Sequence, residues 1–419
     1  MLQTYMPNIS LYRDKRNGFL MFCVLFDVSI NGIPSIISAR KLAFLYLLLE
    51  YGMQRRRGKI SQYDRSRTLL FAAIVCLILL YVVFISFLYG VLTHENSIIP
   101  RLVYFILYAI VTPVFLASRY SFVEDFMRDV IAALWIQSIA TLALFFSPSL
   151  SEIAEQYIPH GNVDYLRTDR AAGLGAEAGY LTLLLFLGFF YSQYLYEMKE
   201  RRLFHRVSQI LFIGTMFIVG RTGLYISVIF ILYSIYVNMK TKRTHPKAIR
   251  TLLGVLIAGA VLLTVFSSVL TQEQYFRLYY RLTGILNKDT DDSSVSALMA
   301  MKIPKLTSEF LLGTGIYRGK TAIGTSIQND SGYVQMYAAL GLFSAIVFYV
   351  ALFVYMVSAL RHDIRKKQNP LLHHFLLFLI LTLFVVEIKE PFILKYVLVM
   401  NIVTNICISG KGGRIVYYD

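Results

Sequence analysis

Residues 68–92 read TLLFAAIVCLILLYVVFISFLYGVL, and no charged side chain interrupts them. About 20 apolar residues in a helix cross the hydrocarbon core of a bilayer, so this stretch predicts a membrane-spanning helix. The rest of the 419 residues follows the same pattern: 57% are hydrophobic, only 16% are charged, and the mean hydropathy is +0.58. We therefore expect an all-α polytopic membrane protein. The continuous apolar runs exclude the alternating pattern of a transmembrane β-barrel.

Apolar length and flanking charge predict about twelve spans in one transmembrane domain that covers residues 1–419. The spans fall near residues 18–37, 41–53, 68–92, 102–118, 127–147, 177–197, 207–219, 222–238, 251–270, 330–358, 373–388 and 391–409. Basic runs concentrate on the cytoplasmic side of membrane proteins. Runs of Lys and Arg all fall on one side of these spans if both termini are cytoplasmic, namely those at residues 55–59, 199–202, 240–243 and 365–367.

Two connections on the opposite side are unusually long, residues 148–176 and residues 271–329. Long loops outside the spans often carry function, so we expect the outer face to be the active one. The basic runs also explain the net charge of +16, and nucleic acid is not an expected partner.

Neither metal nor another cofactor is expected. The cysteines, Cys23, Cys76 and Cys407, lie in apolar segments without the paired spacing of a metal site. An Asp-x-Asp pattern ends at Asp291 and resembles a metal site of nucleotide-sugar transferases, but it lies in a polar loop with no strand context.

The stretch Phe217-Ile-Val-Gly-Arg-Thr-Gly-Leu224 places Arg221 inside the apolar residues 207–238. A straight helix of that length would measure about 48 Å, which exceeds a hydrocarbon core of about 30 Å. Gly220 and Gly223 permit a turn, so we expect a hairpin with Arg221 at its tip, below the membrane surface. An arginine buried there costs on the order of 2.5 to 3.5 kcal/mol, and it would bind an anion or extend to the interface.

A second cluster enters a helix from the first long loop, Arg167-Thr-Asp-Arg-Ala-Ala-Gly-Leu-Gly-Ala-Glu-Ala-Gly179. Arg167 and Arg170 precede glycines that let a backbone approach a ligand closely, and arginine is suited to bidentate phosphate contacts. Glu177 falls in the first helical turn, where the helix dipole alone would favour a carboxylate.

The third cluster closes the second long loop, Ser326-Ile-Gln-Asn-Asp-Ser-Gly-Tyr333. Asp330 is a candidate base, and an N-cap role would explain it equally well. Upstream, Leu312-Gly-Thr-Gly-Ile-Tyr-Arg-Gly319 adds a glycine turn with Arg318. The last outer turn, Glu387-Ile-Lys-Glu-Pro391, fits either a pocket wall or a plain hairpin tip.

The three outer clusters, in this order, resemble the O-antigen polymerase and ligase superfamily of bacterial membrane glycosyltransferases. The resemblance covers most of the chain from the third span onward. It rests on Arg170 with Gly173, on Gly-Arg-Thr-Gly around Arg221, on Leu-Gly-Thr-Gly, and on Asn-Asp-Ser-Gly-Tyr followed by Leu340-Gly-Leu342. The family implies a GT-C-like fold with the large periplasmic loop between spans nine and ten.

The resemblance implies an enzyme of the bacterial inner membrane that acts at its periplasmic face on saccharides carried by undecaprenyl diphosphate, with inversion and without metal. It assigns leaving-group stabilisation to Arg170 and Arg221, and the base role to Asp330 with Glu177 as its rival. Arg167, Arg318 and Tyr333 would contact the substrate. Membrane lipids and a chain-length regulator are the other partners that the family implies.

Two alternatives remain besides a polymerase of O-antigen or a related polysaccharide. Ligases that transfer finished chains to lipid A core carry a histidine eleven residues before the last glycine, where this chain has Asp330 before Gly341. That difference favours a polymerase. A transporter or flippase for the same lipid-linked sugars would need a polar path through the membrane, and few ionisable residues lie in the middle of the predicted spans.

Overall fold

The computed structural model describes most of the apolar chain. The described residues are 17–33, 37–56, 66–158, 173–174, 178–198, 201–240, 264, 268, 272, 303–322, 324–327, 329–361 and 370–409. Six of their helices are long and apolar enough to cross a membrane, and three more apolar helices are shorter. An all-α membrane protein is thus supported. The count of twelve spans and their orientation stay predictions, and the span expected at 251–270 lies almost wholly outside the described residues.

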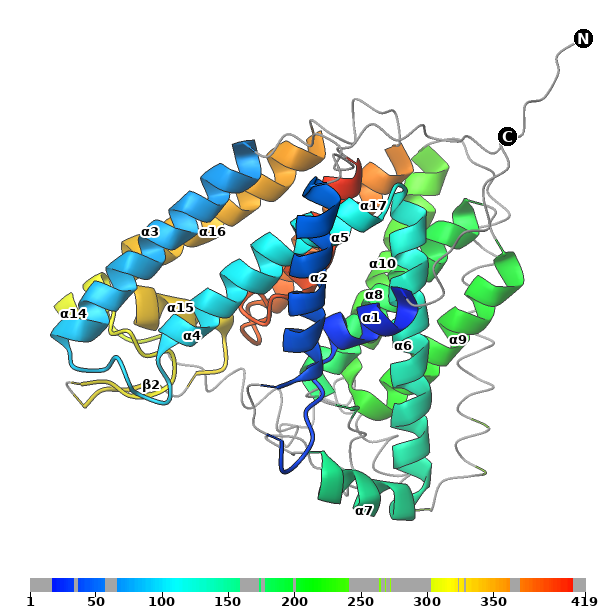
Figure 1. Ribbon diagram of the computed structural model, residues 1–419, viewed down its shortest axis with the longest axis horizontal. Coiled ribbons are helices and arrows are strands. Elements are labelled where there is room, and N and C mark those ends of the chain that lie inside the picture. The colour runs from blue at the N-terminus through cyan, green and yellow to red at the C-terminus, as the bar shows by residue number, and fades with distance from the viewer. Residues whose placement is uncertain are drawn as a thin grey trace, which may run out of the picture.

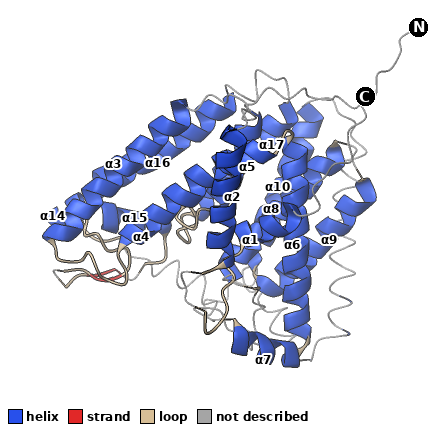
Figure 2. Ribbon diagram, viewed as in Figure 1, coloured by secondary structure: helices blue, strands red, loops and turns tan. Residues whose placement is uncertain are grey.

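The regular elements keep one chain order from end to end. They are α1 (Asn17–Leu25), α2 (Ala39–Arg56), α3 (Ser66–Leu88), α4 (Ile98–Phe105), the π-helix η1 (Ile106–Val111), α5 (Thr112–Arg119), α6 (Val123–Phe146), α7 (Pro148–Tyr157), α8 (Ala178–Glu197), α9 (Arg202–Val219), α10 (Arg221–Lys240), α14 (Ser308–Leu312), β1 (Gly319–Lys320), β2 (Ser326–Ile327), α15 (Gly332–Leu340), α16 (Leu342–Ala359), α17 (Pro370–Val386) and α18 (Val397–Ser409). The two strands form one antiparallel hairpin, and the rest is helical (Figure 2).

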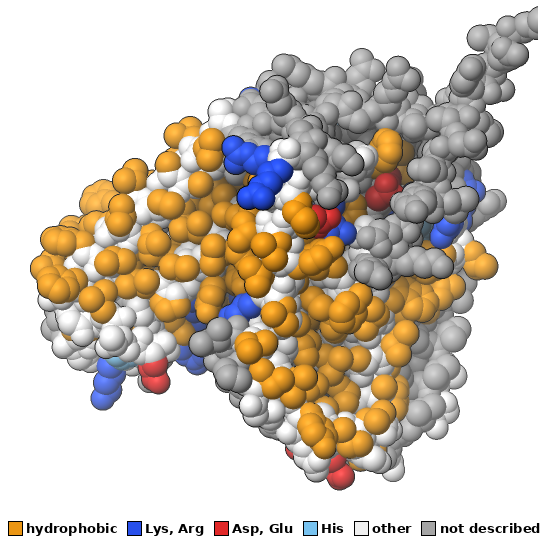
Figure 3. All heavy atoms as spheres, in the orientation of Figure 1, with side chains coloured by type: hydrophobic (Ala, Val, Ile, Leu, Met, Phe, Trp, Pro, Cys, Tyr) orange, Lys and Arg blue, Asp and Glu red, His pale blue; other side chains and the backbone are white. Residues whose placement is uncertain are grey.

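The core lies around α18, whose residues from Val397 to Ile408 are all buried. This helix packs against α5, η1 and α8, while α3 and α16 lie side by side at one edge of the molecule (Figure 1). On α3, Leu77 and Leu80 are 66% and 65% exposed, as expected of side chains that face lipid. Figure 3 shows hydrophobic side chains over most of the described surface, with most charged side chains toward the two ends of the molecule.

The predicted outer connections lie at one end of the molecule. Helix α7, the connection between α1 and α2, and the β1–β2 hairpin all lie at the lower end of Figure 1. Asn31 joins two of them, since its backbone N–H donates to the Tyr157 carbonyl at 2.7 Å. The first long loop, predicted at 148–176, thus begins with a helix. Which end faces the periplasm stays a prediction.

Two predicted spans are shorter in the structure than their apolar runs. The run at 18–37 is helical only to Leu25, because the Arg40 guanidinium donates to the carbonyls of Val24 and Leu25 at 3.0 and 2.7 Å and caps α1 there. The run at 391–409 becomes helical only at Val397, after a turn that ends at Tyr396. Apolar length alone therefore overestimated both helices.

The predicted span 330–358 is broken into α15 and α16 at Gly341, which has a φ of +81°. The chain at Thr314 and Gly315 donates backbone hydrogen bonds to the carbonyls of Ala338 and Ala339, at 2.9 and 3.0 Å, so the last turn of α15 is bonded to the second long loop. A single helix here was a wrong prediction. The predicted interruption at Gly220, in contrast, is confirmed, since α9 ends at Val219 and α10 begins at Arg221.

Candidate functional site

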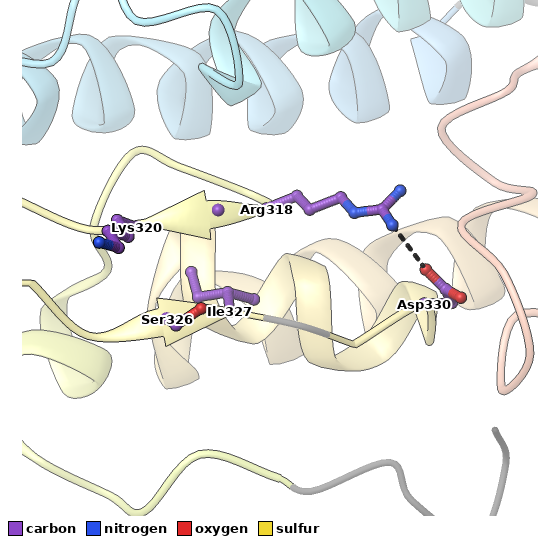
Figure 4. Close-up of a pocket in the computed structure, with 6 residues that line it drawn as sticks. Arg318, Lys320, Ser326, Ile327 and Asp330 are labelled. Atoms are coloured by element: carbon purple, nitrogen blue, oxygen red, sulfur yellow. Dashed lines mark ion pairs between the residues drawn. The ribbon is translucent and has the colours of Figure 1, made fainter. Parts of the chain in front are cut away.

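Arg318 and Asp330 line one pocket of about 540 Å³. Gly319, Lys320, Ser326 and Ile327 complete its lining (Figure 4). In the figure, the Arg318 side chain extends from β1 toward Asp330, and its Nη2 lies 3.6 Å from Oδ1 of that carboxylate. Both side chains are more than half exposed, at 60% and 55%. The pocket therefore holds two cations and one carboxylate that a solute can reach.

The chain before α4 holds the hairpin in place. Ser97 forms an isolated β-bridge with Ile316, and the Ile98 N–H donates to the Gly315 carbonyl at 3.0 Å. The Arg101 guanidinium lies 3.5 Å from the centre of the Tyr317 ring, a cation–π contact. The position of Arg318 is thus fixed by contacts of its two preceding residues, Ile316 and Tyr317.

Asp330 lies just before α15, and the N-cap of that helix is Ser331. The Asn329 side chain accepts a hydrogen bond from the Ser331 N–H at 2.8 Å, and the Asn329 carbonyl accepts one from Gln335 at 3.0 Å. Asn329, Ser331 and Gln335 are all buried, whereas the Asp330 side chain is exposed to the pocket. The N-cap explanation for Asp330 is therefore not what the structure shows.

Residues 387–396 between α17 and α18, which we name the α17–α18 turn, contact two of the three sequence clusters directly. The Gly332 N–H donates to the Glu387 carbonyl at 2.9 Å. A Cβ on Gly332 would lie 2.1 Å from Oε1 of Glu387, so only glycine permits this approach. Two residues further, Lys389 donates from its ammonium to the Thr222 hydroxyl at 3.1 Å, which brings the turn to the residue after Arg221.

The third cluster meets the same turn through the start of α8. A Cβ on Gly179 would lie 2.8 Å from Oε1 of Glu390, so the backbone of α8 touches that carboxylate. Glu390 also forms an ion pair with Lys395 at 3.2 Å. Within α8, the Thr182 hydroxyl donates to the Gly220 carbonyl at 3.0 Å, which joins the start of α8 to the α9–α10 junction. All three predicted clusters therefore meet at one turn.

Glu387 is a fully buried carboxylate in this turn, just beyond the last residue of α17. It accepts hydrogen bonds from the Tyr349 hydroxyl at 3.0 Å and from the Ile393 N–H at 2.8 Å. Burial raises the pKa of Glu387 to about 8, although these hydrogen bonds act in the opposite direction. Its burial and its partners indicate that it holds the turn against α16.

The other end of the turn is bound by Arg40 at the start of α2. Arg40 donates to the Tyr396 hydroxyl, and the ring of Tyr108, in the π-helix η1, lies 5.0 Å from the Tyr396 ring. Tyr396 has a φ of +49°, which is rare for a residue other than glycine. Such a strained conformation persists only where surrounding contacts fix it, and Arg40 and Tyr108 supply them here.

The predicted site residues fall into three groups. Arg318 and Asp330 lie together in the pocket. Arg221 and Tyr333 lie next to the α17–α18 turn: Arg221 is the first residue of α10, and the Tyr333 hydroxyl donates to the Phe384 carbonyl at 2.8 Å while its ring packs on Tyr349. Outside the described residues are Arg167, Arg170, Glu177 and the Asp-x-Asp pattern at Asp291.

The sequence reasoning did not name Arg40, Lys389 or Lys395 as site residues. It noted residues 387–391 only as a pocket wall or a hairpin tip, and the signal available was two opposite charges next to a proline between apolar runs. Among the described residues, no group of three or more His, Cys, Asp or Glu side chains is placed to hold a metal ion. No protein-family model matches the chain, and no curated protein sequence matches it.

Proposed function

We propose that the protein is a glycosyltransferase of the bacterial inner membrane that polymerises undecaprenyl-diphosphate-linked oligosaccharide repeat units at the periplasmic face. The observation that carries this proposal is the meeting of the three glycine-containing clusters at the α17–α18 turn. Gly179, Thr222 and Gly332 lie in segments far apart in the sequence, and each belongs to one of the clusters on which the family resemblance rests.

The chemistry follows from charge and exposure. The growing glycan leaves its undecaprenyl diphosphate when a hydroxyl of the incoming unit attacks the anomeric carbon from the opposite side. The anomeric C–O bond breaks, its electron pair goes to the diphosphate, and the hydroxyl proton goes to a carboxylate. Asp330 accepts this proton in our proposal, with Glu177 as the rival base. Arg221 and Arg170 stabilise the charge that develops on the leaving diphosphate.

The pocket beside Asp330 suits an acceptor sugar. It is open to solvent through exposed side chains, and it combines a carboxylate with the cations Arg318 and Lys320. Sugar hydroxyls both donate and accept hydrogen bonds, so a mixed lining of this kind orients them. The exposed apolar faces of α3 and α16 would lie in lipid, where the undecaprenyl chains of both substrates are soluble.

Polymer synthesis by the purified protein tests the proposal. Full-length protein in detergent, incubated with a lipid-linked repeat unit and a chelator, should give a ladder of products. Asp330→Asn should abolish the ladder or slow it by about 100-fold or more, the usual range for loss of a general base. Arg318→Gln should weaken it while leaving the melting temperature nearly unchanged, because an exposed ion pair contributes only about 0 to 1 kcal/mol.

The alternatives predict other results. Wild-type protein that builds no ladder but joins a finished chain to lipid A core would be a ligase. Protein that does neither, yet moves the lipid-linked sugar across a vesicle membrane, would be a transporter. Normal ladders from both Asp330→Asn and Arg221→Ala would show that the proposed site is wrong.

A further inference from the structure

Cationic side chains gather at the α17–α18 turn from three separate elements. Lys389 and Lys395 belong to the turn itself, Arg40 reaches it from α2, and Arg221 begins α10 next to Thr222. Each of these four side chains is at least partly buried. Cations withdrawn from water are costly unless anions or hydrogen-bond acceptors compensate them, so the distribution of negative charge around them is informative.

The described carboxylates near the turn do not balance these cations. Glu390 pairs with Lys395 at 3.2 Å, and Asp27 lies 3.9 Å from Arg40. Glu387 is fully buried and accepts hydrogen bonds from Tyr349 and Ile393. With the pKa of Glu387 at about 8, this third carboxyl group is mostly protonated at pH 7. Among the described residues, Lys389 and Arg221 therefore remain as excess positive charge on adjoining segments.

Lys389 is held where it faces the start of α10. Its ammonium donates to the Thr222 hydroxyl at 3.1 Å, and an ammonium has three protons to donate. The turn is fixed on both sides of Lys389, by Glu387 with Gly332 and by Glu390 with Lys395. A lysine ammonium in a fixed position one residue from an arginine has the charge that a diphosphate requires.

We propose that Lys389 binds the diphosphate of the lipid carrier together with Arg221, so that the α17–α18 turn is an anion-binding element of the site. The choice of ligand rests on the proposed function. A diphosphate carries at least two negative charges and non-bridging oxygens on both phosphorus atoms. The Lys389 ammonium would bind an oxygen on one phosphate, while the guanidinium of Arg221 accommodates the other in a bidentate contact.

The competing explanation is that Lys389 merely ties the turn to α10 through Thr222. Two substitutions separate the explanations. Thr222→Val removes the hydroxyl that accepts the hydrogen bond but keeps the ammonium, whereas Lys389→Met removes the ammonium and keeps the chain length. A tie would make both variants equivalent. A ligand contact makes Lys389→Met the more damaging one, and its effect must depend on the number of phosphates in the ligand.

The experiment measures equilibrium binding of undecaprenyl diphosphate and of undecaprenyl monophosphate to the purified full-length protein in detergent. We expect wild-type protein to prefer the diphosphate. Lys389→Met should lower the affinity for the diphosphate by about tenfold or more, as expected for loss of a charge-assisted hydrogen bond, and reduce the preference over the monophosphate. Thr222→Val should have a smaller effect. The matched control is Lys305→Met, an exposed lysine before α14, which should bind both lipids like wild type.

Each other outcome overturns the proposal. Equal affinities of wild type and Lys389→Met for the diphosphate would remove Lys389 from the site, and so would equal losses in Lys389→Met and Thr222→Val with the diphosphate preference intact. Wild-type protein that does not bind the diphosphate lipid would also overturn it. The ladder assay reports separately on the proposed function: a ladder with unchanged Lys389→Met binding refutes only the lysine, and Lys389-dependent binding without any ladder refutes only the polymerase.

Discussion

At the scale of single residues, Glu387 makes the stability of the fold depend on pH. Its pKa is about 8 in the folded protein against an ordinary value of 4.5, so the folded state keeps a proton that the unfolded chain loses between these values. Stability is therefore highest below pH 4.5, falls as pH rises to about 8, and is level above it. Each pKa unit corresponds to about 1.4 kcal/mol, so the loss should reach a few kcal/mol.

Glu387→Gln tests this directly. The amide can accept from the Ile393 N–H and donate to the Tyr349 hydroxyl, as the protonated carboxyl group does, but it does not titrate. We expect the melting temperature of wild-type protein in detergent to fall between pH 5 and pH 8, and that of the variant to vary much less. Parallel melting curves for the two proteins across this range would show that Glu387 is ionised in the fold.

Residue types could be predicted from the sequence more readily than residue partners. Asp330 and Arg318 were candidates because of their chemistry, and the structure pairs them through a hairpin that no periodicity announces. Lys389 was overlooked because its role depends on Thr222, a contact between residues 167 positions apart. Such contacts follow from tertiary packing, which local pattern does not encode.

At the scale of elements, Gly341 and Gly313 decide how the large outer loop meets the membrane helices. A Cβ on Gly341 would lie 2.5 Å from the carbonyl carbon of Leu312, and one on Gly313 would lie 2.5 Å from the Gly341 nitrogen. The two backbones therefore touch where α15 ends. This explains why the chain has glycines in both Leu-Gly motifs, and why the apolar run at 330–358 does not form one helix.

Gly341→Ala should therefore destabilise the protein more than Gly90→Ala. Both glycines have positive φ, +81° and +66°, which costs an alanine about 1 kcal/mol, but a Cβ on Gly90 meets nothing within 4 Å. Overpacking against the Leu312 backbone adds about 1 to 3 kcal/mol for Gly341. The measurement is the melting temperature of the two variants. Equal shifts would mean that only backbone strain matters at both sites.

Helices were predictable where a long apolar run had no competing bond, as in α3 and α6, and not where a distant group interrupts the run. Arg40 ends α1 by binding its last carbonyls, and Thr314 and Gly315 do the same for α15. In both places the interrupting donor comes from another part of the chain, so the sequence of the helix itself contains no sign of its end.

At the scale of the whole molecule, the outer clusters are useful only because the fold brings them to one end. The turn that joins them lies near the centre of Figure 1, between α4 and α2, and it is bonded to α8, α10 and α15 by way of Gly179, Thr222 and Gly332. A short turn with so many neighbours cannot move without disturbing several helices. We infer that the anionic end of the site is rigid and that substrate motion is left to the lipid.

The orientation of this end is the last prediction. The distribution of basic runs places the 89–97 connection in the periplasm and the end of α2 in the cytoplasm. In a variant with Cys23, Cys76 and Cys407 each replaced by alanine, Thr93→Cys should react with a membrane-impermeant thiol reagent in cells whose outer membrane alone is permeabilised, because Thr93 is exposed. Arg56→Cys, equally exposed, should react only after the inner membrane is opened. The reverse labelling would turn the molecule over and place the Asp330 pocket in the cytoplasm. It would then exclude a polymerase that works on lipid-linked repeat units at the periplasmic face, whatever the chemistry of the pocket.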